Sequence, residues 1–561
     1  MAEQVEAQSA SAPAGGAEGS EREHFFGAAK VVAGLTMCSR VLGLVREVAL
    51  TALGATAAMD AYRVAFSIPH LFRRLFGEGA TSASFVPVFT EVLQTDGEQR
   101  ARQVLANATG WLALVLLLVA GLVEGGIGVW LLVGSPAHYD ALLGQLVMIM
   151  LPFMITVCLL ALTSAALNCR GHFAYPAFAP VLLNVFQITA AATVYALGWG
   201  DSRKSLVLLS CAVVAAGVVQ LALAVLLLRR HRLTAWPTLR PLLPEVRKIA
   251  SLTAGMLVPL GVLQFSAFYD RFYAFAMAAT PADPTVSLFG LILRKPLQPG
   301  VVTWFDNANR LYQLPLGILA ISLATAVFPL FSRYAAANDT QGLRSAVNRA
   351  LRLSFFMGIP AGVGLILLAR PIITVIFLRG QYTPADAASA AYILRMYSIG
   401  MWAFFANHIL LRAFFAQKDT RTPLRVAALL TIGNVLLVTG LVWTPLREGA
   451  LGLATAATSS INMLLLTYIL RRRWGRLGLG RIVRSVARTA IATAAMGGVI
   501  VVLAWAIRTW LEPAETGVMI RAGALTVGGV LGGAGTFIGV ARLLGAPEIG
   551  ELLGRGKAAE G

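Results

Sequence analysis

Apolar residues run along this chain in long blocks that are separated by short polar segments. A helix that crosses a bilayer needs about 20 mostly apolar residues, because each residue adds about 1.5 Å and the hydrocarbon core is about 30 Å thick. We therefore predict an all-α integral membrane protein with about fourteen transmembrane helices. The blocks lie near residues 27–53, 59–92, 105–133, 142–169, 176–199, 205–228, 249–278, 301–332, 350–378, 386–416, 424–445, 449–470, 484–508 and 519–544.

The second block is the least regular of the fourteen. Pro69, the run Gly77-Glu78-Gly79 and Pro87 interrupt it. Proline removes a backbone donor from a helix, so we expect this helix to be kinked or broken. Residues 279–300 separate two blocks and contain several prolines. They are expected to form an enlarged extracytoplasmic loop with room for a short surface helix.

Positive charge alternates between successive loops. When the N-terminus is placed inside, the inner loops are rich in Arg and Lys, whereas the outer loops GATAAM and GSPAHYD contain neither. Short cytoplasmic loops carry an excess of positive residues, so the pattern places both termini in the cytoplasm. The inner-loop residues are Arg100, Arg102, Arg170, Arg229, Arg230, Arg232, Arg240, Arg247, Lys248, Arg333, Arg344, Arg349, Lys418, Arg421, Arg471, Arg472, Arg473, Arg476 and Arg481.

Two short matches indicate an internal repeat. Ala61-Tyr62-Arg63-Val64 resembles Ala308-Asn309-Arg310-Leu311, and a proline opens the fifth block as another opens the eleventh. Both pairs are 247 residues apart, which predicts two six-helix lobes of the same orientation, around a central cavity, plus two C-terminal helices. The expected division is a disordered cytoplasmic tail at 1–25, an N-lobe at 26–230, a C-lobe at 246–473, helices 13 and 14 at 481–545, and a cytoplasmic tail at 546–561.

Composition agrees with a membrane protein. Hydrophobic residues make up 57% of the chain, charged residues 13%, and the mean hydropathy is +0.73. The net charge of +19 would suggest nucleic acid in a soluble protein, but here it gathers in loops, so we expect no nucleic-acid partner. The four cysteines form no CxxC pair and are interpreted as packing residues without a disulfide or a metal.

Ionisable residues also lie inside the apolar blocks, where each costs several kcal/mol unless it faces a cavity or a partner. Arginine is the commonest of them. Its guanidinium is always charged, and its planar fork matches phosphate oxygens. A water-filled cavity lined by arginines would attract a large anion. The candidate cavity residues are Arg40, Arg46, Arg63, Arg73, Arg74 and Arg310.

Other interpretations of these arginines stay open. Arg73 and Arg74 lie where a side chain can extend to the membrane surface. Four of the charges can instead form structural ion pairs, Arg46 with Glu47 and Asp60 with Arg63. Arg40 and Arg46 are roughly 240° apart around an ideal helix, so they converge only if the helix bends, whereas Arg40 and Glu47 share a face.

Few other residues suggest chemistry. Asp270 can bind a cation or a proton, or pair with Arg271, and His408 is interpreted as a core or interface residue. The chain contains no Walker loop, no HExxH and no nucleophile elbow, so we expect no catalytic residues and a transporter rather than an enzyme.

Several segments carry a family resemblance. Residues 39–47 read SRVLGLVRE, residues 69–80 read PHLFRRLFGEGA, residues 85–89 read FVPVF, residues 176–180 read PAFAP, and residues 418–423 read KDTRTP. In these segments the chain resembles the MurJ (MviN) lipid II flippases, from about residue 27 to the end but without 279–300. The resemblance implies the multidrug/oligosaccharidyl-lipid/polysaccharide exporter superfamily, a central cationic cavity, and a lipid groove formed with the last two helices.

The resemblance also assigns roles to residues. It implies cavity arginines at Arg40, Arg46, Arg73 and Arg310, with gating or structural charges at Glu47, Asp60 and Glu78. Where the family often has Asp-Arg in helix 8, this chain has Asn309-Arg310.

A sodium site is implied by some members of the family. They bind Na⁺ between helices 7, 11 and 12, and Asp270 and Asn434 match two of those ligands. The acidic position one turn after Asn434 is Val438 here, which weakens the match.

The expected function is a lipid II flippase in the bacterial inner membrane, which carries the undecaprenyl-pyrophosphate-linked peptidoglycan precursor to the outer leaflet by alternating access. No cofactor is expected beyond coupling to Na⁺, H⁺ or the membrane potential. The expected partners are lipid II, membrane lipids and the cell-wall synthesis machinery.

Three alternatives stay open. The first two are a flippase for another undecaprenyl-linked glycan and a drug exporter of the same superfamily, although an exporter of cations should have an acidic cavity. The third is an integral-membrane glycosyltransferase, which would need extracytoplasmic carboxylates, and Asp283 is the only acid in the 279–300 loop.

Overall fold

The structure is a computed structural model that describes residues 15–134, 136–234, 236–288, 290–510 and 515–552. All fourteen apolar blocks are helical in it. The N-terminal part contains α1 (Gly15–Thr51), α2 (Ala57–Phe72), the π-helical η1 (Arg73–Ala80), α3 (Thr81–Thr95), α4 (Gly97–Val133), α5 (His138–Cys169), α6 (Ala174–Ala196) and α7 (Arg203–Arg230).

After α7 the chain continues with α8 (Pro244–Ala276), the strands β1 (Thr285–Leu288) and β2 (Leu291–Arg294), α9 (Val301–Pro315), the π-helical η2 (Leu316–Ala320), α10 (Ile321–Ala336) and α11 (Thr340–Phe377). It ends with α12 (Pro384–Ser398), α13 (Met401–Ala416), α14 (Arg421–Leu441), α15 (Gly449–Trp474), α16 (Leu479–Trp510), α17 (Glu515–Leu543) and α18 (Pro547–Leu552).

Fewer helices of the described chain qualify as transmembrane spans, by their length and hydropathy, than the fourteen predicted. Among the described residues, ten helices are long and apolar enough to cross a membrane, and α12 with α13, bent by 48°, makes an eleventh. The count of fourteen is therefore not confirmed. The three blocks that do not qualify among the described residues are α1, α2 to α3, and α8.

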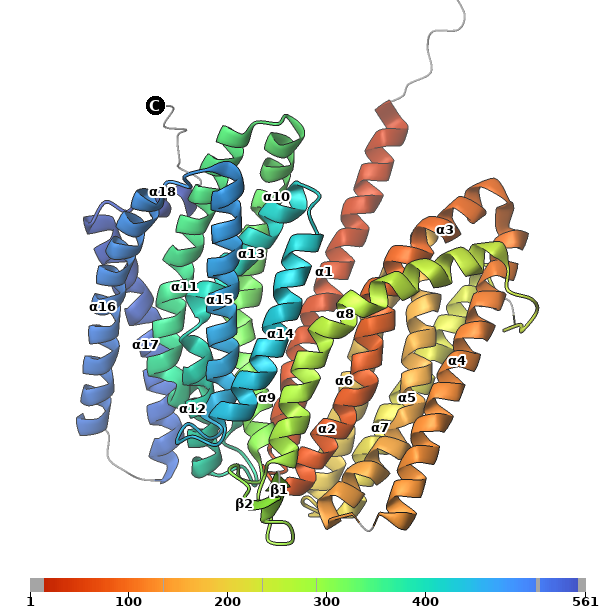
Figure 1. Cartoon of the computed structure of the whole chain (residues 1–561), viewed down its shortest axis with the longest axis horizontal. Helices are drawn as coiled ribbons and strands as arrows, with labels where there is room; N and C mark the ends of the chain where they lie inside the picture. The colour runs from red at the N-terminus through yellow and green to blue at the C-terminus, as the bar shows by residue number, and fades with distance from the viewer. Residues whose placement is uncertain (1–14, 135, 235, 289, 511–514, 553–561) are drawn as a thin grey trace, which may run out of the picture.

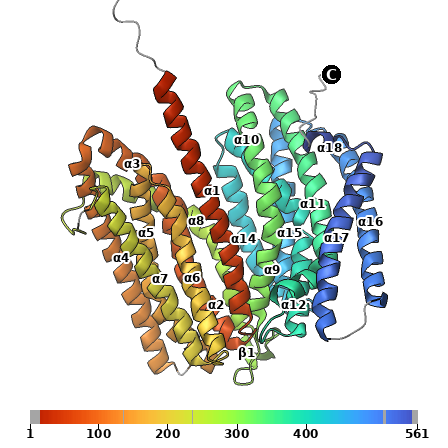
Figure 2. The ribbon, with the colours of Figure 1, turned by 180° about the vertical axis from the view of Figure 1, so that it is seen from behind.

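The helices form two groups that lean apart toward one end of the molecule (Figure 1). We call α1–α7 the N-terminal half and α9–α15 the C-terminal half. The helix α8 runs between them, and α16 and α17 pack on the outer side of α11. Seen from behind, α1 lies at the junction of the two halves (Figure 2). The start of α1 and the helix α18 lie at the same end of the molecule, which we call the terminal end; the opposite end carries the β-hairpin.

The hydrophobic core shows where the halves are joined. At the hairpin end one cluster contains residues of both halves, including Leu50, Met59 and Phe153 from the first and Phe305 and Tyr397 from the second. At the terminal end each half has its own core: α10, α11, α13, α15 and α16 share one, and α3, α4, α5, α7 and the start of α8 share another. The halves therefore share a packed core at the hairpin end and have separate cores at the terminal end.

The predicted irregularity of the second helix is confirmed. After Pro69 the backbone becomes π-helical over η1 and resumes as α3 in a new direction (Figure 1). The C-terminal half repeats this arrangement, because Pro315 ends α9 and is followed by the π-helical η2 and then α10. Proline lacks the backbone donor of an α-helix, which favours such a break. The equivalent breaks support the repeat.

Two expectations about the connecting segments need correction. The loop at 279–300 forms a two-stranded antiparallel hairpin, not a surface helix, in which Val286 pairs with Leu293 and Ser287 with Ile292. Thr285, Val286 and Ile292 of this segment are β-branched, and β-branched residues favour strands. The tail expected to be disordered over 1–25 is helical from Gly15 onward, and residues 1–14 lie outside the described part of the chain.

The C-terminal segment also folds onto the protein, at the terminal end. Glu548 of α18 is 1% exposed and accepts hydrogen bonds from Arg352 (3.1 Å) and from Ser485 (2.8 Å). Glu551 forms ion pairs with Arg349 (3.0 Å) and Arg352 (3.7 Å). We call these five residues the C-terminal clamp. Part of the tail predicted at 546–561 is thus an ordered helix, and residues 553–561 lie outside the described residues.

Candidate functional site

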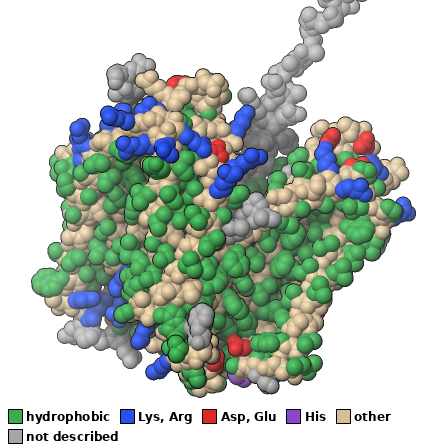
Figure 3. All heavy atoms as spheres, in the orientation of Figure 1, with side chains coloured by type: hydrophobic (Ala, Val, Ile, Leu, Met, Phe, Trp, Pro, Cys, Tyr) green, Lys and Arg blue, Asp and Glu red, His purple; other side chains and the backbone are tan. Residues whose placement is uncertain are grey.

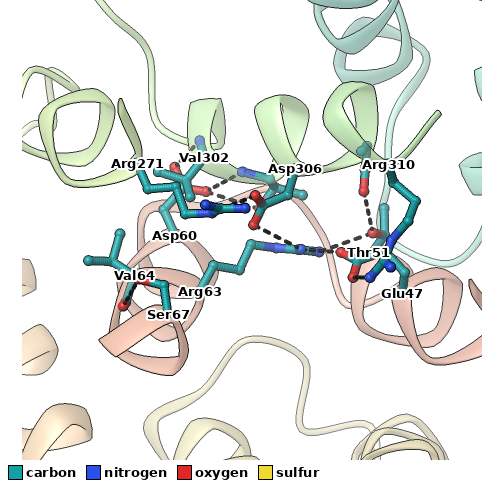
Figure 4. A network of polar contacts seen from close by, with 12 residues as sticks. Glu47, Thr51, Asp60, Arg63, Val64, Ser67, Arg271, Val302, Asp306 and Arg310 are labelled. Atoms are coloured by element: carbon teal, nitrogen blue, oxygen red, sulfur yellow. Dashed lines mark hydrogen bonds and ion pairs between the residues drawn. The ribbon is translucent and has the colours of Figure 1, made fainter. Parts of the chain in front are cut away.

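Charged residues of three helices meet where the two halves join. Glu47 lies four residues before the end of α1, Arg63 six residues after the start of α2, and Asp306 five residues after the start of α9. At about 1.5 Å per residue these positions are roughly 6–9 Å inside the hairpin-end termini of their helices. Figure 4 shows the resulting network between the halves.

Glu47 is the carboxylate of the N-terminal half in this network. It is 5% exposed, and one of its oxygens accepts a hydrogen bond from Arg63. Its other oxygen lies 3.5 Å from Arg310 and 3.8 Å from Arg46. One buried carboxylate thus holds three guanidiniums, two from its own half and one from the other half.

Asp306 is the carboxylate of the C-terminal half. It accepts a hydrogen bond of 2.8 Å from Arg271 Nε and lies 3.7 Å from Arg63. Arg63 also donates to Thr51 Oγ1 at 3.1 Å, and that hydroxyl donates to Asn307 Oδ1 at 3.1 Å. We call Arg46, Glu47, Arg63, Arg271, Asp306 and Arg310 the charge seam (Figure 4).

The charge seam contains more positive than negative groups. Its four guanidiniums face two carboxylates, which leaves two positive charges. Nε of Arg46 is buried without a hydrogen-bond partner among the described residues, and the ring of Phe66 lies 5.6 Å from its guanidinium. The side chain of Arg310 is 38% exposed. Guanidinium groups that outnumber the carboxylates around them, in a place that water can reach, form a site for an anion.

Asp60 has a different role from the one its sequence neighbours suggested. It does not form an ion pair with Arg63. Its buried carboxylate accepts hydrogen bonds from the backbone of Gly300 (2.8 Å), Val302 (3.3 Å) and Thr303 (3.0 Å), and from the Thr303 hydroxyl. These donors are the free N–H groups at the start of α9, which favour a negative charge. Asp60 therefore joins the two halves by capping a helix of the opposite half.

Three predicted cavity arginines lie outside the charge seam. Arg40 is exposed and precedes Glu47 by about 10 Å along α1. Arg73 and Arg74 lie in η1, about 15 Å along the helix from Arg63, and Arg74 donates to Gln264 at 3.1 Å. All three lie closer to the terminal end than the seam does. Glu78 belongs to η1, and its side chain lies outside the described residues.

The sequence pointed to only part of the network. The expected aspartate is absent at position 309, and Asn309 accepts a hydrogen bond from Gln313. The carboxylate is instead Asp306, which is four residues before Arg310 and so shares a helix face with it. That spacing was a signal in the sequence. Nothing in the sequence showed that Arg271 pairs with Asp306 instead of its neighbour Asp270.

Asp270 and Asn434, the two residues predicted as sodium ligands, lie in contact. Asn434 Nδ2 lies 3.1 Å from Asp270 Oδ1 and 3.2 Å from Ser266 Oγ, and its amide oxygen faces Thr458 at 3.5 Å. A hard cation requires several oxygens around one point. Here an amide N–H group of Asn434 faces the carboxylate, and the side chain of Val438 adds no oxygen. Sodium binding at these residues stays a prediction.

Basic side chains gather at the terminal end of the molecule, and the belt between the two ends is largely hydrophobic (Figure 3). This surface matches a protein whose middle lies in lipid and whose ends lie in water.

Comparisons with known proteins agree on one family. The family model described as "Lipid II flippase MurJ" matches residues 50–518. A probable lipid II flippase MurJ of Vibrio cholerae is 32% identical over 534 residues, which cover 92% of this chain and 95% of that protein. The lipid II flippase MurJ of Burkholderia cenocepacia is 32% identical over 473 residues, with coverages of 80% and 84%.

Solved structures show the same fold. A lipid II flippase MurJ in an inward closed conformation superposes with a TM-score of 0.71 at 22% identity, and covers 91% of this chain and 98% of that one. An inward-facing multidrug resistance MATE family transporter superposes with a TM-score of 0.61 at 15% identity, with coverages of 80% and 98%.

Proposed function

This chain belongs to the lipid II flippase MurJ family, and from that premise we propose that it carries lipid II from the cytoplasmic to the outer leaflet of the bacterial inner membrane. It is a multi-pass membrane protein and a transporter, not an enzyme. The observation that carries the proposal is the charge seam, whose two surplus positive charges lie between the halves at membrane depth.

The cargo chemistry suits this site. Lipid II joins a long apolar chain to a pyrophosphate and a sugar-peptide headgroup. Guanidinium groups bind phosphate oxygens in pairs, and Arg46 and Arg310 are the two seam arginines with the weakest contacts to carboxylates. We assign them the pyrophosphate. Arg40, Arg73 and Arg74, closer to the terminal end, are assigned to earlier contacts with the entering headgroup.

The orientation follows from charge. We place both termini in the cytoplasm because basic side chains gather at the terminal end (Figure 3). With that orientation, the halves are closed toward the outer side, where they share one core, and apart toward the cytoplasm. Transport then requires the hairpin-end contacts to open while the terminal ends of the halves approach each other.

The lipid tail needs a path through the hydrocarbon. We assign it to the surface beside α16 and α17, which pack against α11 with glycines at the contact. A Cβ added at Gly529 would lie 2.8 Å from Leu368, so this hairpin fits closely on the C-terminal half and moves with it. On the outer side the headgroup would pass to the enzymes of cell-wall synthesis.

We propose that the membrane potential or proton binding drives the cycle. Na⁺ has no part in the proposed steps. Moving one charge across 100 mV changes the free energy by about 2.3 kcal/mol. A seam with two surplus positive charges that becomes exposed to the outer side would respond to that potential.

The test is rescue of cells that are depleted of their own lipid II flippase. We expect the wild-type chain to restore growth and to restore cleavage of lipid II headgroups by an externally added enzyme. Arg310→Ala should express normally and restore neither. If the wild-type chain is well expressed in the membrane and restores neither, lipid II is not its cargo.

A further inference from the structure

The ion pairs of the charge seam fall into two classes. Pairs of the first class lie within a half: Arg63 hydrogen bonds to Glu47 and Arg46 lies 3.8 Å from it in the N-terminal half, and Arg271 Nε lies 2.8 Å from Asp306 in the other. Pairs of the second class cross between the halves, with Arg310 at 3.5 Å from Glu47 and Arg63 at 3.7 Å from Asp306. Separating the halves breaks only the crossing pairs, and each carboxylate keeps its closest guanidinium.

Arg271 belongs with the C-terminal half in this division. The part of α8 around it is bonded to α14, since Tyr269 and Thr439 share a hydroxyl hydrogen bond of 2.7 Å and Tyr273 donates to the Thr439 carbonyl at 3.2 Å. Asp270, next to Arg271, accepts a hydrogen bond from Asn434 of α14. The Arg271–Asp306 pair therefore stays together when α2 moves away from α9.

The two surplus positive charges of the seam are divided evenly between the two halves. In the N-terminal half, Glu47 neutralises one of Arg46 and Arg63, and in the C-terminal half Asp306 neutralises one of Arg271 and Arg310. Among the six seam residues, each half therefore contributes one net positive charge, both when the halves touch and when they are apart. A buried charge left without a partner costs several kcal/mol, and this arrangement avoids that cost for both seam carboxylates during opening.

We infer that Asp306, Arg63 and Arg271 are positioning residues of the transport cycle, which balance the charge of each half so that each seam carboxylate keeps a guanidinium of its own half when the seam opens and closes. The inference rests on the proposed alternating-access function. Asp306 does not contact cargo in it. It keeps the C-terminal half at one net positive charge, so that the mutual repulsion of the halves stays small and an anion that bridges Arg46 and Arg310 can draw them together.

The test uses a disulfide reporter of seam closure. Gln381 N donates to the carbonyl of Ala52 at 2.8 Å across the two halves, away from the seam charges. In the full chain, with the four native cysteines replaced by alanine, the pair Ala52→Cys and Gln381→Cys should crosslink readily, because residues joined in this way have a spacing that a disulfide can span. The rate of crosslinking in membranes then reports how often the hairpin end is closed.

Asp306→Asn gives the C-terminal half two uncompensated guanidiniums, so we expect crosslinking to slow by about tenfold and transport to fall with it. Adding Arg271→Gln to that variant restores the charge balance, and the rate should return to within about twofold of wild type. The matched control is Asp283→Asn, a carboxylate whose ion pair with Lys295 stays inside the hairpin loop, and it should leave the rate unchanged.

Two results would overturn the inference. One is a crosslinking rate for Asp306→Asn equal to that of wild type. The other is a double variant as slow as the single one, because a closure that depends on the charge balance should recover when the balance is restored. Failure of the cargo assignment looks different: no variant, wild type included, rescues depleted cells, while the order of crosslinking rates stays as described.

Discussion

The charge seam and the C-terminal clamp are two clusters of partly buried Arg and Glu or Asp residues that are built in opposite ways. The clamp has two arginines and two glutamates, so it is neutral, and its bonds fix α18 and α16 to α11. The seam has four arginines and two carboxylates, and some of its pairs cross between the halves.

The difference separates two uses of buried charge. A neutral cluster whose members all keep their partners stabilises one arrangement of helices. A cluster with surplus charge and long pairs across an interface stabilises that interface weakly and leaves guanidinium groups for a ligand. Changes in the clamp should therefore act on stability, and changes in the seam should act on transport.

The largest expected effect is on the clamp. Glu548→Gln leaves Arg352 without its buried carboxylate and should lower the free energy of unfolding by about 2–3 kcal/mol. Thermal unfolding in detergent measures it, with Glu551→Gln, at the more exposed position, as the milder control. Rescue of depleted cells should persist wherever the protein accumulates. A normal unfolding temperature together with lost rescue would remove the distinction between the two clusters.

Arg310→Ala is the matching change in the seam. It removes a guanidinium that is 38% exposed and assigned to the pyrophosphate, so transport should fall about tenfold to thirtyfold while the unfolding temperature stays close to wild type. Arg310→Lys keeps the charge without the planar fork and should recover only part of the activity. Full transport by Arg310→Ala would show that the seam does not bind the cargo.

Asp60→Asn tests the contact that closes the seam at the hairpin end. The amide keeps an acceptor but loses the charge that favours the start of α9, which should weaken the closed state by about 1 kcal/mol. The Ala52–Gln381 cysteine pair should then crosslink several times more slowly. Unchanged crosslinking would mean that the shared core alone holds this end closed.

Arg40→Ala should have a smaller effect. Arg40 is exposed and about two turns from Glu47, so we expect a two- to threefold loss of transport and no loss of stability. The rate of headgroup exposure, normalised to the amount of protein, measures it. Complete loss of transport would place Arg40 in the cargo site itself and extend that site toward the terminal end.

The smallest effect is expected for the ion pair between Asp419 and Arg473, which serves as a reference for both clusters. Partial burial acts to raise the pKa of Asp419, but hydrogen bonds from Thr422 and Arg473 outweigh it and lower this pKa to about 2. The pair's contribution is thus complete above the unfolded pKa of 3.8 and is lost as the pH falls toward 2.

Because the pair is largely in water, Asp419→Asn should cost only a few tenths of a kcal/mol. The difference in unfolding free energy between this variant and wild type should be constant from about pH 5 to pH 8 and should close below about pH 3. Denaturation curves across this range measure it. A difference that grows toward low pH would contradict the assignment.

Much of the fold could be predicted because it depends on short-range patterns. Each apolar block is long enough to be a helix, and Pro69 with its following glycines marked the break at η1. The hairpin at 285–294 was missed because several prolines suggested a loop, although its strands contain β-branched residues. The site was predicted only in part: Arg46, Arg63, Glu47 and Arg310 meet as expected, whereas Arg40, Arg73 and Arg74 lie elsewhere.

The sequence by itself determined that arginines lie at membrane depth, that apolar helices surround them, and that the loops differ in charge. These are properties of local composition. Only the tertiary structure decided that Asp60 caps α9 and that Asp306 holds Arg271 and Arg63. An ion pair depends on the distance between two side chains to within about 1 Å. Between residues more than two hundred positions apart, that distance is set by how whole helices pack.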